Sequence, residues 1–187
     1  MWVGEATQVY SVRSGYSILI GESSMQSSES FKYLWSLCVA PSAIVCAWRI
    51  LLDRMPTILN LARRGVQLAN LFCPLCQDGV ESTDHLFNTC IMVQQVWDQC
   101  DKWIGKVGVR HQATHVNFQS FCLVGQKQSV NRAWKGMWVA IALEVWSLRN
   151  KVVFKGGVVD AVEIFSLAQL KGWLWAKYKM KKTSFSY

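Results

Sequence analysis

The segment from Phe72 to Cys90, FCPLCQDGVESTDHLFNTC, constrains this chain more strongly than any other. Cys73 and Cys76 form a C-x2-C pair. Eight residues separate Cys76 from His85, and four residues separate His85 from Cys90. Two cysteines at this spacing can direct both sulfur atoms at one ion from a tight turn, and zinc readily takes thiolate sulfur and imidazole nitrogen. The spacing therefore predicts one structural zinc site, in which four protein ligands leave no coordination position open for catalysis.

A chain reversal and a short helix are expected to bring these ligands together. Gly79 allows the chain to reverse after the cysteine pair, because glycine adopts positive φ without steric cost. Ser82 or Thr83 is expected to cap the N-terminus of a short helix. His85 would lie on that helix and Cys90 near its end, about one helical turn apart. The alternative is that the cysteines are free thiols in a core, but the neighbouring histidine favours a metal.

The composition predicts a folded chain with an anionic partner. Of the 187 residues, 51% are hydrophobic, which suffices for one domain, with or without an appendage. The net charge of +8 favours an anionic partner. The number of cysteines is odd, at seven, and four of them are not in a regular framework. Together with the lack of a basic-then-apolar leader, this indicates a reducing compartment, so we expect an intracellular protein, nuclear or cytoplasmic and not secreted. The longest apolar run, near residues 137–143, is too short to span a bilayer, so no membrane partner is expected.

Apolar residues at helical spacing predict helices along most of the chain. Phe31, Leu34, Trp35 and Cys38 fall at i, i+3, i+4 and i+7, which predicts that Cys38 lies in the core. Further helices are expected in five segments, namely 42–53, 57–64, 93–104, 130–154 and 160–181. The tryptophans that lie on such apolar stripes are expected in the core, namely Trp35, Trp48, Trp138 and Trp146.

Residues 105–129 show no such period and are expected to form an irregular linker. His111 and His115 lie there at i, i+4 spacing, but without a helix signal or an acid between them they do not predict a second metal site. We therefore expect a mainly α fold. A small helical domain at 1–104, stapled by one Cys3His zinc site, is followed by the linker and by a helical C-terminal extension at 130–187.

The first half of the chain contains several short motifs, each of which occurs once. In chain order they are YSVRSGY at 10–16, Trp48-Arg49, DRMPT at 53–57, NLARRG at 60–65, CPLC at 73–76 and HLF at 85–87. In order and spacing, the chain from Trp2 to Trp97 resembles the zinc-binding domain that follows the reverse transcriptase in plant LINE-type, non-LTR retrotransposons. The later VWSLRNKVVFKGG is similar to the W-x-x-R-N-x-x-x-F segment that often follows this domain in such plant proteins. The resemblance implies the same four zinc ligands and a nucleic-acid-associated role beside a polymerase.

The leading hypothesis is a zinc-stabilised, non-catalytic module that binds RNA or DNA of a retroelement. Zinc would fix the turn after NLARRG, and basic side chains would contact phosphates, which supplies affinity without sequence information. The candidate contacts are Arg49, Arg54, Arg63, Arg64, Lys177, Lys179, Lys181 and Lys182. For the lysines, the alternative is a solvated helix end that complements the helix dipole. A reverse transcriptase is a further expected partner, and no small-molecule substrate is expected.

Two other hypotheses remain open. The chain could be a protein-interaction or scaffold module whose tryptophan-rich C-terminal helices dock on a polymerase, or a transposon fragment without a selected activity. An enzyme is not expected. The acids are scattered singly, and the chain lacks the paired-aspartate motif of a reverse transcriptase palm.

Overall fold

The computed structural model describes residues 31–105 and 110–183, with side chains up to residue 177. The fold is mainly helical, as predicted. Within the described ranges there is no β-strand, and one isolated antiparallel bridge joins Phe72 to Val80. None of the described helices is both long and apolar enough to cross a bilayer.

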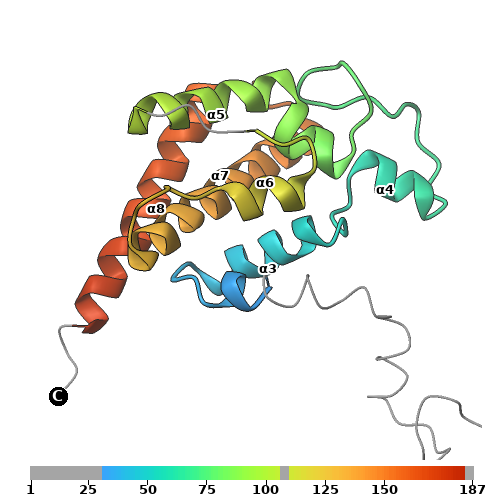
Figure 1. Ribbon diagram of the computed structural model, residues 1–187. Helices are drawn as coiled ribbons and strands as arrows, with labels where there is room; N and C mark the ends of the chain where they lie inside the picture. Colours follow the sequence, from blue (N-terminus) through green and yellow to red (C-terminus); the bar gives the residue numbers. More distant parts are fainter. Residues whose placement is uncertain (1–30, 106–109, 184–187) are drawn as a thin grey trace, which may run out of the picture. The chain divides into compact units, whose positions relative to one another are not determined.

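The chain divides into two compact units, Met1–Ser36 and Leu37–Tyr187. The described part of the first unit contains a helix over residues 31–35. The second unit contains the elements labelled in Figure 1 and a π-helical turn, η1. In chain order these are α3 (Pro41–Leu51), α4 (Ile58–Arg63), η1 (His85–Thr89), α5 (Ile91–Ile104), α6 (Thr114–Ser120), α7 (Gln128–Lys155) and α8 (Ala161–Thr183). Each helical segment predicted after residue 41 coincides with a helix.

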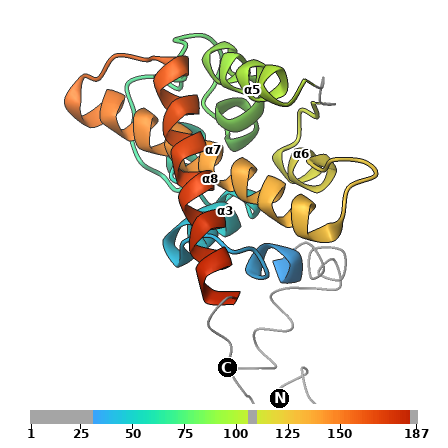
Figure 2. The ribbon, with the colours of Figure 1, turned by 90° about the vertical axis from the view of Figure 1, so that its left-hand side faces the viewer.

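Helix α7 packs against α3, α8 and η1 and forms the centre of the second unit. Every residue from 134 to 142 is buried, as its broad apolar face predicts. In Figure 2, α8 lies in front of α7 and crosses it. Gly172 permits a close approach of the two helices, because a Cβ atom there would lie 3.2 Å from Met137 Sδ. Lys171 of α8 adds an ion pair with the buried Glu144 of α7.

Helix α6 corrects the expectation that residues 105–129 are irregular. Thr114, Asn117 and Phe118 fall at i, i+3 and i+4 and form one buried stripe. Because two of these three residues are polar, the stripe carries no hydrophobic signal in the sequence. The C-terminal end of α6 is satisfied by Lys135 of α7, whose Nζ donates a hydrogen bond to the carbonyl of Phe118 and lies 4.4 Å from its ring centroid. Burial lowers the pKa of Lys135 to about 8.

The tryptophans expected in the core differ in their exposure. Trp138 is fully buried, and its Nε1 donates a hydrogen bond to Asn117 Oδ1 at 2.9 Å. Trp48 and Trp146 are half-buried. Trp35 is 52% exposed, so its predicted core position is wrong. The helix over residues 31–35 ends at this residue, and the apolar stripe does not continue beyond it.

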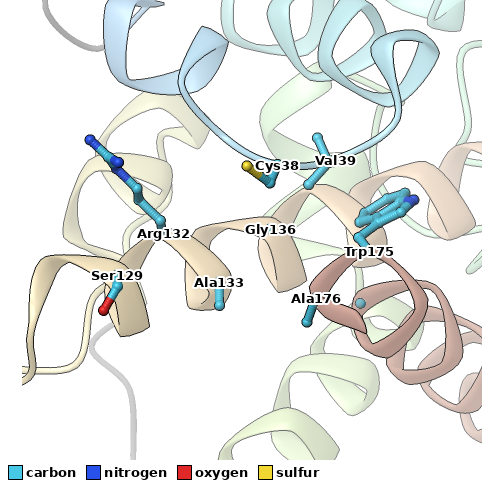
Figure 3. A pocket seen from close by; sticks show the side chains of 9 residues that line it. Cys38, Val39, Ser129, Arg132, Ala133, Gly136, Trp175 and Ala176 are labelled. Atoms are coloured by element: carbon cyan, nitrogen blue, oxygen red, sulfur yellow. The ribbon is translucent and has the colours of Figure 1, made fainter. Parts of the chain in front are cut away.

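For the same reason Cys38 is exposed and not in the core. It lies at a pocket of about 230 Å³ between its own segment and helices α7 and α8 (Figure 3). Gly136 of α7 allows this segment to approach, because a Cβ atom there would lie 3.2 Å from Val39 Cγ1. On the α8 side, Trp175 lines the pocket.

Candidate metal centre

Cys73, Cys76, His85 and Cys90 form one cluster, and their ligand atoms all lie within 4.8 Å of one another. The Sγ atoms of Cys73 and Cys90 are 3.9 Å apart, and Cys76 Sγ lies 3.3 Å from His85 Nε2. A tetrahedral zinc ion with ordinary bond lengths separates two sulfurs by about 3.8 Å and a sulfur from a nitrogen by about 3.5 Å. The structure therefore brings together the four residues that the spacing predicts, at separations that suit such an ion.

A tight turn closed by the single bridge between Phe72 and Val80 positions the cysteine pair. Phe72 and Val80 form the antiparallel bridge, and inside it the amide of Cys73 donates to the carbonyl of Gly79 at 3.0 Å. Gly79 has a φ of +72°, which a residue with a side chain adopts only at a cost. A Cβ atom at Gly79 would also lie 3.2 Å from Cε1 of His85. Glycine is therefore needed here both for the reversal and for the space that the imidazole occupies.

The histidine and the last cysteine are held by a π-helical turn, where an ordinary short helix was expected. The Ser82 hydroxyl accepts a hydrogen bond from the amide of His85 at 3.0 Å, which identifies Ser82 as the capping residue. The amide of Cys90 then donates to the carbonyl of His85 at 2.7 Å, an i to i+5 bond that closes the turn. Thr89 Oγ1 lies 3.5 Å from His85 Nδ1, where the hydroxyl oxygen can accept a hydrogen bond from Nδ1–H and so leave Nε2 free for the ion.

The three cysteines of the cluster differ in the pKa of their thiols. The thiol of Cys90 donates a hydrogen bond to Cys73, which lowers the pKa of Cys73 to about 5. The same hydrogen bond, together with burial, raises the pKa of Cys90. The pKa of Cys76 is raised, chiefly by burial. Because a metal takes thiolates, metal binding at neutral pH would release protons from Cys76 and Cys90.

A buried ion pair fixes the segment that leaves the cysteine turn. The carboxylate of Glu81 is fully buried and accepts hydrogen bonds from Arg149 Nε at 2.7 Å and Arg149 Nη2 at 2.8 Å. Its Oε2 also accepts a hydrogen bond from the amide of Ile58, the first residue of α4, at 2.7 Å. One carboxylate therefore joins the metal loop to α4 and to α7. The sequence assigned no role to Arg149, although it belongs to the W-x-x-R-N segment.

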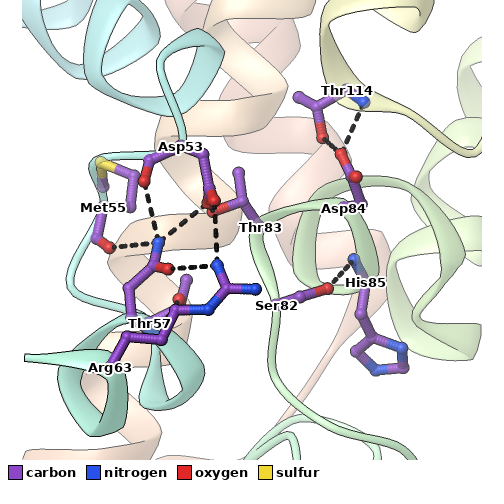
Figure 4. A network of polar contacts seen from close by, with 10 residues as sticks. Asp53, Met55, Thr57, Arg63, Ser82, Thr83, Asp84, His85 and Thr114 are labelled. Atoms are coloured by element: carbon purple, nitrogen blue, oxygen red, sulfur yellow. Dashed lines mark hydrogen bonds and ion pairs between the residues drawn. The ribbon is translucent and has the colours of Figure 1, made fainter.

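The residues just before His85 anchor the loop on both sides (Figure 4). Thr83 Oγ1 donates to Asp53 Oδ1 at 2.5 Å, and the same carboxylate oxygen accepts from Asn60 Nδ2 at 2.8 Å. On the other side, Asp84 Oδ1 accepts hydrogen bonds from the amide and the hydroxyl of Thr114, both at 2.7 Å. The first of these contacts explains why DRMPT and NLARRG accompany the metal loop, because Asp53 and Asn60 lie in those motifs.

The predicted arginines differ in what they are free to contact. Arg49, Arg54 and Arg64 are exposed and make no ion pair with any part of the chain that the structure describes. Arg63 is also exposed, but its Nη1 lies 3.3 Å from Asp53 Oδ2 and forms an ion pair. Three of the four candidate arginines are therefore available to an anionic partner.

The predicted lysines belong to α8, a different element from those that carry the arginines. Lys177 is exposed, and its Nζ lies 4.6 Å from the ring centroid of Trp173 on the same helix. Lys179, Lys181 and Lys182 also belong to α8, but their side chains lie outside the described residues. In Figure 1, α4 and the C-terminal end of α8 lie on opposite sides of the second unit. The arginines at the end of α4 therefore lie apart from this end of α8.

Comparison with known proteins identifies the first part of the chain. Residues 10–97 match the family model described as zinc-binding in reverse transcriptase, and this range contains all four clustered residues. Neither the curated proteins nor the solved structures contain a match. Residues 10–97 of this chain therefore carry a domain of the kind described as zinc-binding in reverse transcriptase, with a Cys3His cluster that could hold its metal ion.

Proposed function

We propose that this chain is a zinc-stabilised, non-catalytic module that binds RNA or DNA beside a reverse transcriptase, in a protein derived from a plant LINE-type retrotransposon. The family match supports the association with reverse transcription. The donor set supports zinc, because three sulfurs and one imidazole at tetrahedral separations suit this ion and would occupy all four of its positions. Bound zinc would supply folding free energy and no open position for a substrate. A thiolate-rich site of this kind fits the reducing interior of a cell.

The observation that carries nucleic-acid binding is the set of exposed arginines near the metal loop. Arg54 follows α3, and Arg64 ends α4, whose first amide is held by Glu81 of the metal loop. The backbone amide of Arg54 donates to the carbonyl of Arg49 at 2.8 Å, which fixes the turn between them. The backbone that carries these arginines is therefore fixed, and their exposed guanidinium groups can contact phosphates. The net charge of +8 would add long-range attraction.

The test is binding of single-stranded and duplex oligonucleotides across a salt series, with metal content assayed on the same sample. One zinc per chain is expected in the natural chain, and less in Cys76→Ser. Replacing the three available arginines, Arg49, Arg54 and Arg64, by alanine should weaken binding. It should also make the slope of log K against log salt concentration shallower, by about 0.7–0.9 for each phosphate contact that is lost. The matched control replaces three exposed lysines outside α3 and α4 by alanine, namely Lys102, Lys127 and Lys155. Equal slopes in the two triple variants, or no binding by the natural chain, would overturn the proposal.

A second candidate function, protein binding, is favoured by apolar side chains beside the metal loop. Residues 65–72 are all exposed, and so is Val80, which pairs with Phe72. The apolar members are 38–54% exposed, namely Val66, Leu68, Leu71, Phe72 and Val80. Exposed apolar groups of this kind commonly mark protein contacts. Binding to a reverse transcriptase that hardly changes with salt and is lost in Phe72→Ser would favour this function over nucleic-acid binding.

A further inference from the structure

Helix α8 carries two apolar faces, and the rest of the second unit covers one of them. Ala161, Ile164, Phe165 and Ala168 are buried on the inner face, where α8 packs against α7 and α5. The second face holds Leu167, Leu170, Trp173 and Leu174, which are 41%, 52%, 56% and 48% exposed. We call these four residues the outer stripe. Their spacing of three, four and seven residues is that of a helix face which packs on another helix.

The charges at the two ends of the outer stripe are opposite and equally spaced. Glu163 lies seven residues before Leu170 and Lys177 lies seven residues after it, about 10 Å away in each direction along the helix axis. Both side chains are exposed. Neither forms an ion pair with any residue in the described ranges. Lys177 Nζ instead lies over the Trp173 ring, which places it on the same face as the stripe.

We propose that the outer stripe is a dimer surface, on which α8 pairs antiparallel with α8 of a second copy of this chain. A two-fold axis beside Leu170 would pack the two Leu170 side chains together. The same axis would place Leu167 against Trp173 of the partner subunit. It would also place Glu163 opposite Lys177 of the partner subunit, twice by symmetry.

The order of the charges distinguishes a second copy from other occupants. A parallel pairing would place like charges opposite each other at both ends, whereas the antiparallel pairing makes two attractive contacts. A nucleic acid would meet four apolar side chains and the carboxylate of Glu163, which repels phosphate. The apolar stripe with an acid at one end and a base at the other is complementary to itself, and this dimer requires neither the metal ion nor a nucleic acid.

The test is the mass of the full chain in solution over a range of protein concentrations, by sedimentation velocity, for the natural chain and five variants. Glu163→Lys and Lys177→Glu each turn two attractive contacts into repulsive ones, so each should raise the dimer dissociation constant about tenfold. The double variant restores opposite charges and should return the dissociation constant to near that of the natural chain. Leu170→Asp should give a monomer, and Lys155→Glu, an exposed charge change outside the stripe, should have no effect.

Three outcomes would overturn the proposal. One is a natural chain that stays monomeric at the highest concentration reached. Another is a dimer that persists in Leu170→Asp with unchanged helicity. The third is a double variant no tighter than the two single ones. If the natural chain is monomeric and Lys177→Glu binds oligonucleotides more weakly than the natural chain does, this lysine contacts nucleic acid. That result would also count against the dimer.

Discussion

At the scale of single residues, Gly79 and Gly65 share a left-handed backbone conformation but differ in their surroundings. Both have positive φ, +72° for Gly79 and +84° for Gly65. A Cβ atom on Gly65 would meet nothing within 4 Å, whereas one on Gly79 would meet the ring of His85. The two positions therefore separate the cost of backbone strain from the cost of displacing a candidate metal ligand.

Alanine at each glycine tests this difference. Gly65→Ala and Gly79→Ala should each lower the free energy of unfolding by about 1–2 kcal/mol through the strained φ. Gly79→Ala alone should also weaken zinc affinity, by about tenfold or more, because the imidazole must shift. Competition with a zinc chelator measures the affinity, and urea unfolding measures the stability. Equal zinc affinities in the two variants would show that the contact with His85 has no effect on the site.

At the scale of elements, strong periodic signals predict the long helices and leave α6 unpredicted. Helices α5 and α7 follow from their apolar period because their burial is a property of their own sequence. Helix α6 has only seven residues, and its buried Thr114 is satisfied by Asp84 and Asn88 from another part of the chain. A local pattern cannot show this, because the partners are supplied by tertiary contact.

The candidate site also has a part that the sequence predicts and a part that it does not. The four ligands are predictable because zinc chemistry imposes their types and spacing within one short segment. The ion pair of Glu81 with Arg149 joins residues 68 positions apart, and neither residue carries a local signal for its partner. The sequence also does not predict the π-helical form of η1, because a helix cap at Ser82 is equally compatible with an α-helix.

The link from the metal loop to α6 gives a prediction at this scale. Asp84→Ala removes the acceptor of both Thr114 hydrogen bonds and should lower the free energy of unfolding by about 1–3 kcal/mol. Amide hydrogens of α6 should exchange faster with solvent, which hydrogen exchange with mass spectrometry measures. Asp78→Ala, an exposed acid of the same loop, is the control and should leave α6 unchanged. Equal protection of α6 in both variants would contradict the anchoring role of Asp84.

At the scale of the whole molecule, the family match ends inside a compact unit. The matched range stops at residue 97, in the middle of α5, and α5 continues to Ile104 and packs against α8. Residues from Leu37 onward form one compact unit. The pair of Glu81 and Arg149 is a buried polar connection between the metal loop and α7. The C-terminal helices therefore complete the surroundings of the metal loop.

This connection can be measured through the stability of the whole second unit. Arg149→Met would leave the carboxylate of Glu81 buried without its cation and should lower the free energy of unfolding by about 3–5 kcal/mol. Arg63→Met breaks the exposed pair with Asp53 and should cost at most about 1 kcal/mol. Adding Glu81→Gln to Arg149→Met removes the buried charge while an amide oxygen can still accept from Ile58, so the double variant should recover much of the loss. Urea unfolding followed by circular dichroism gives all these values. Equal losses for Arg149→Met and Arg63→Met, or no recovery in the double variant, would mean that the metal loop and α7 are not coupled through this pair.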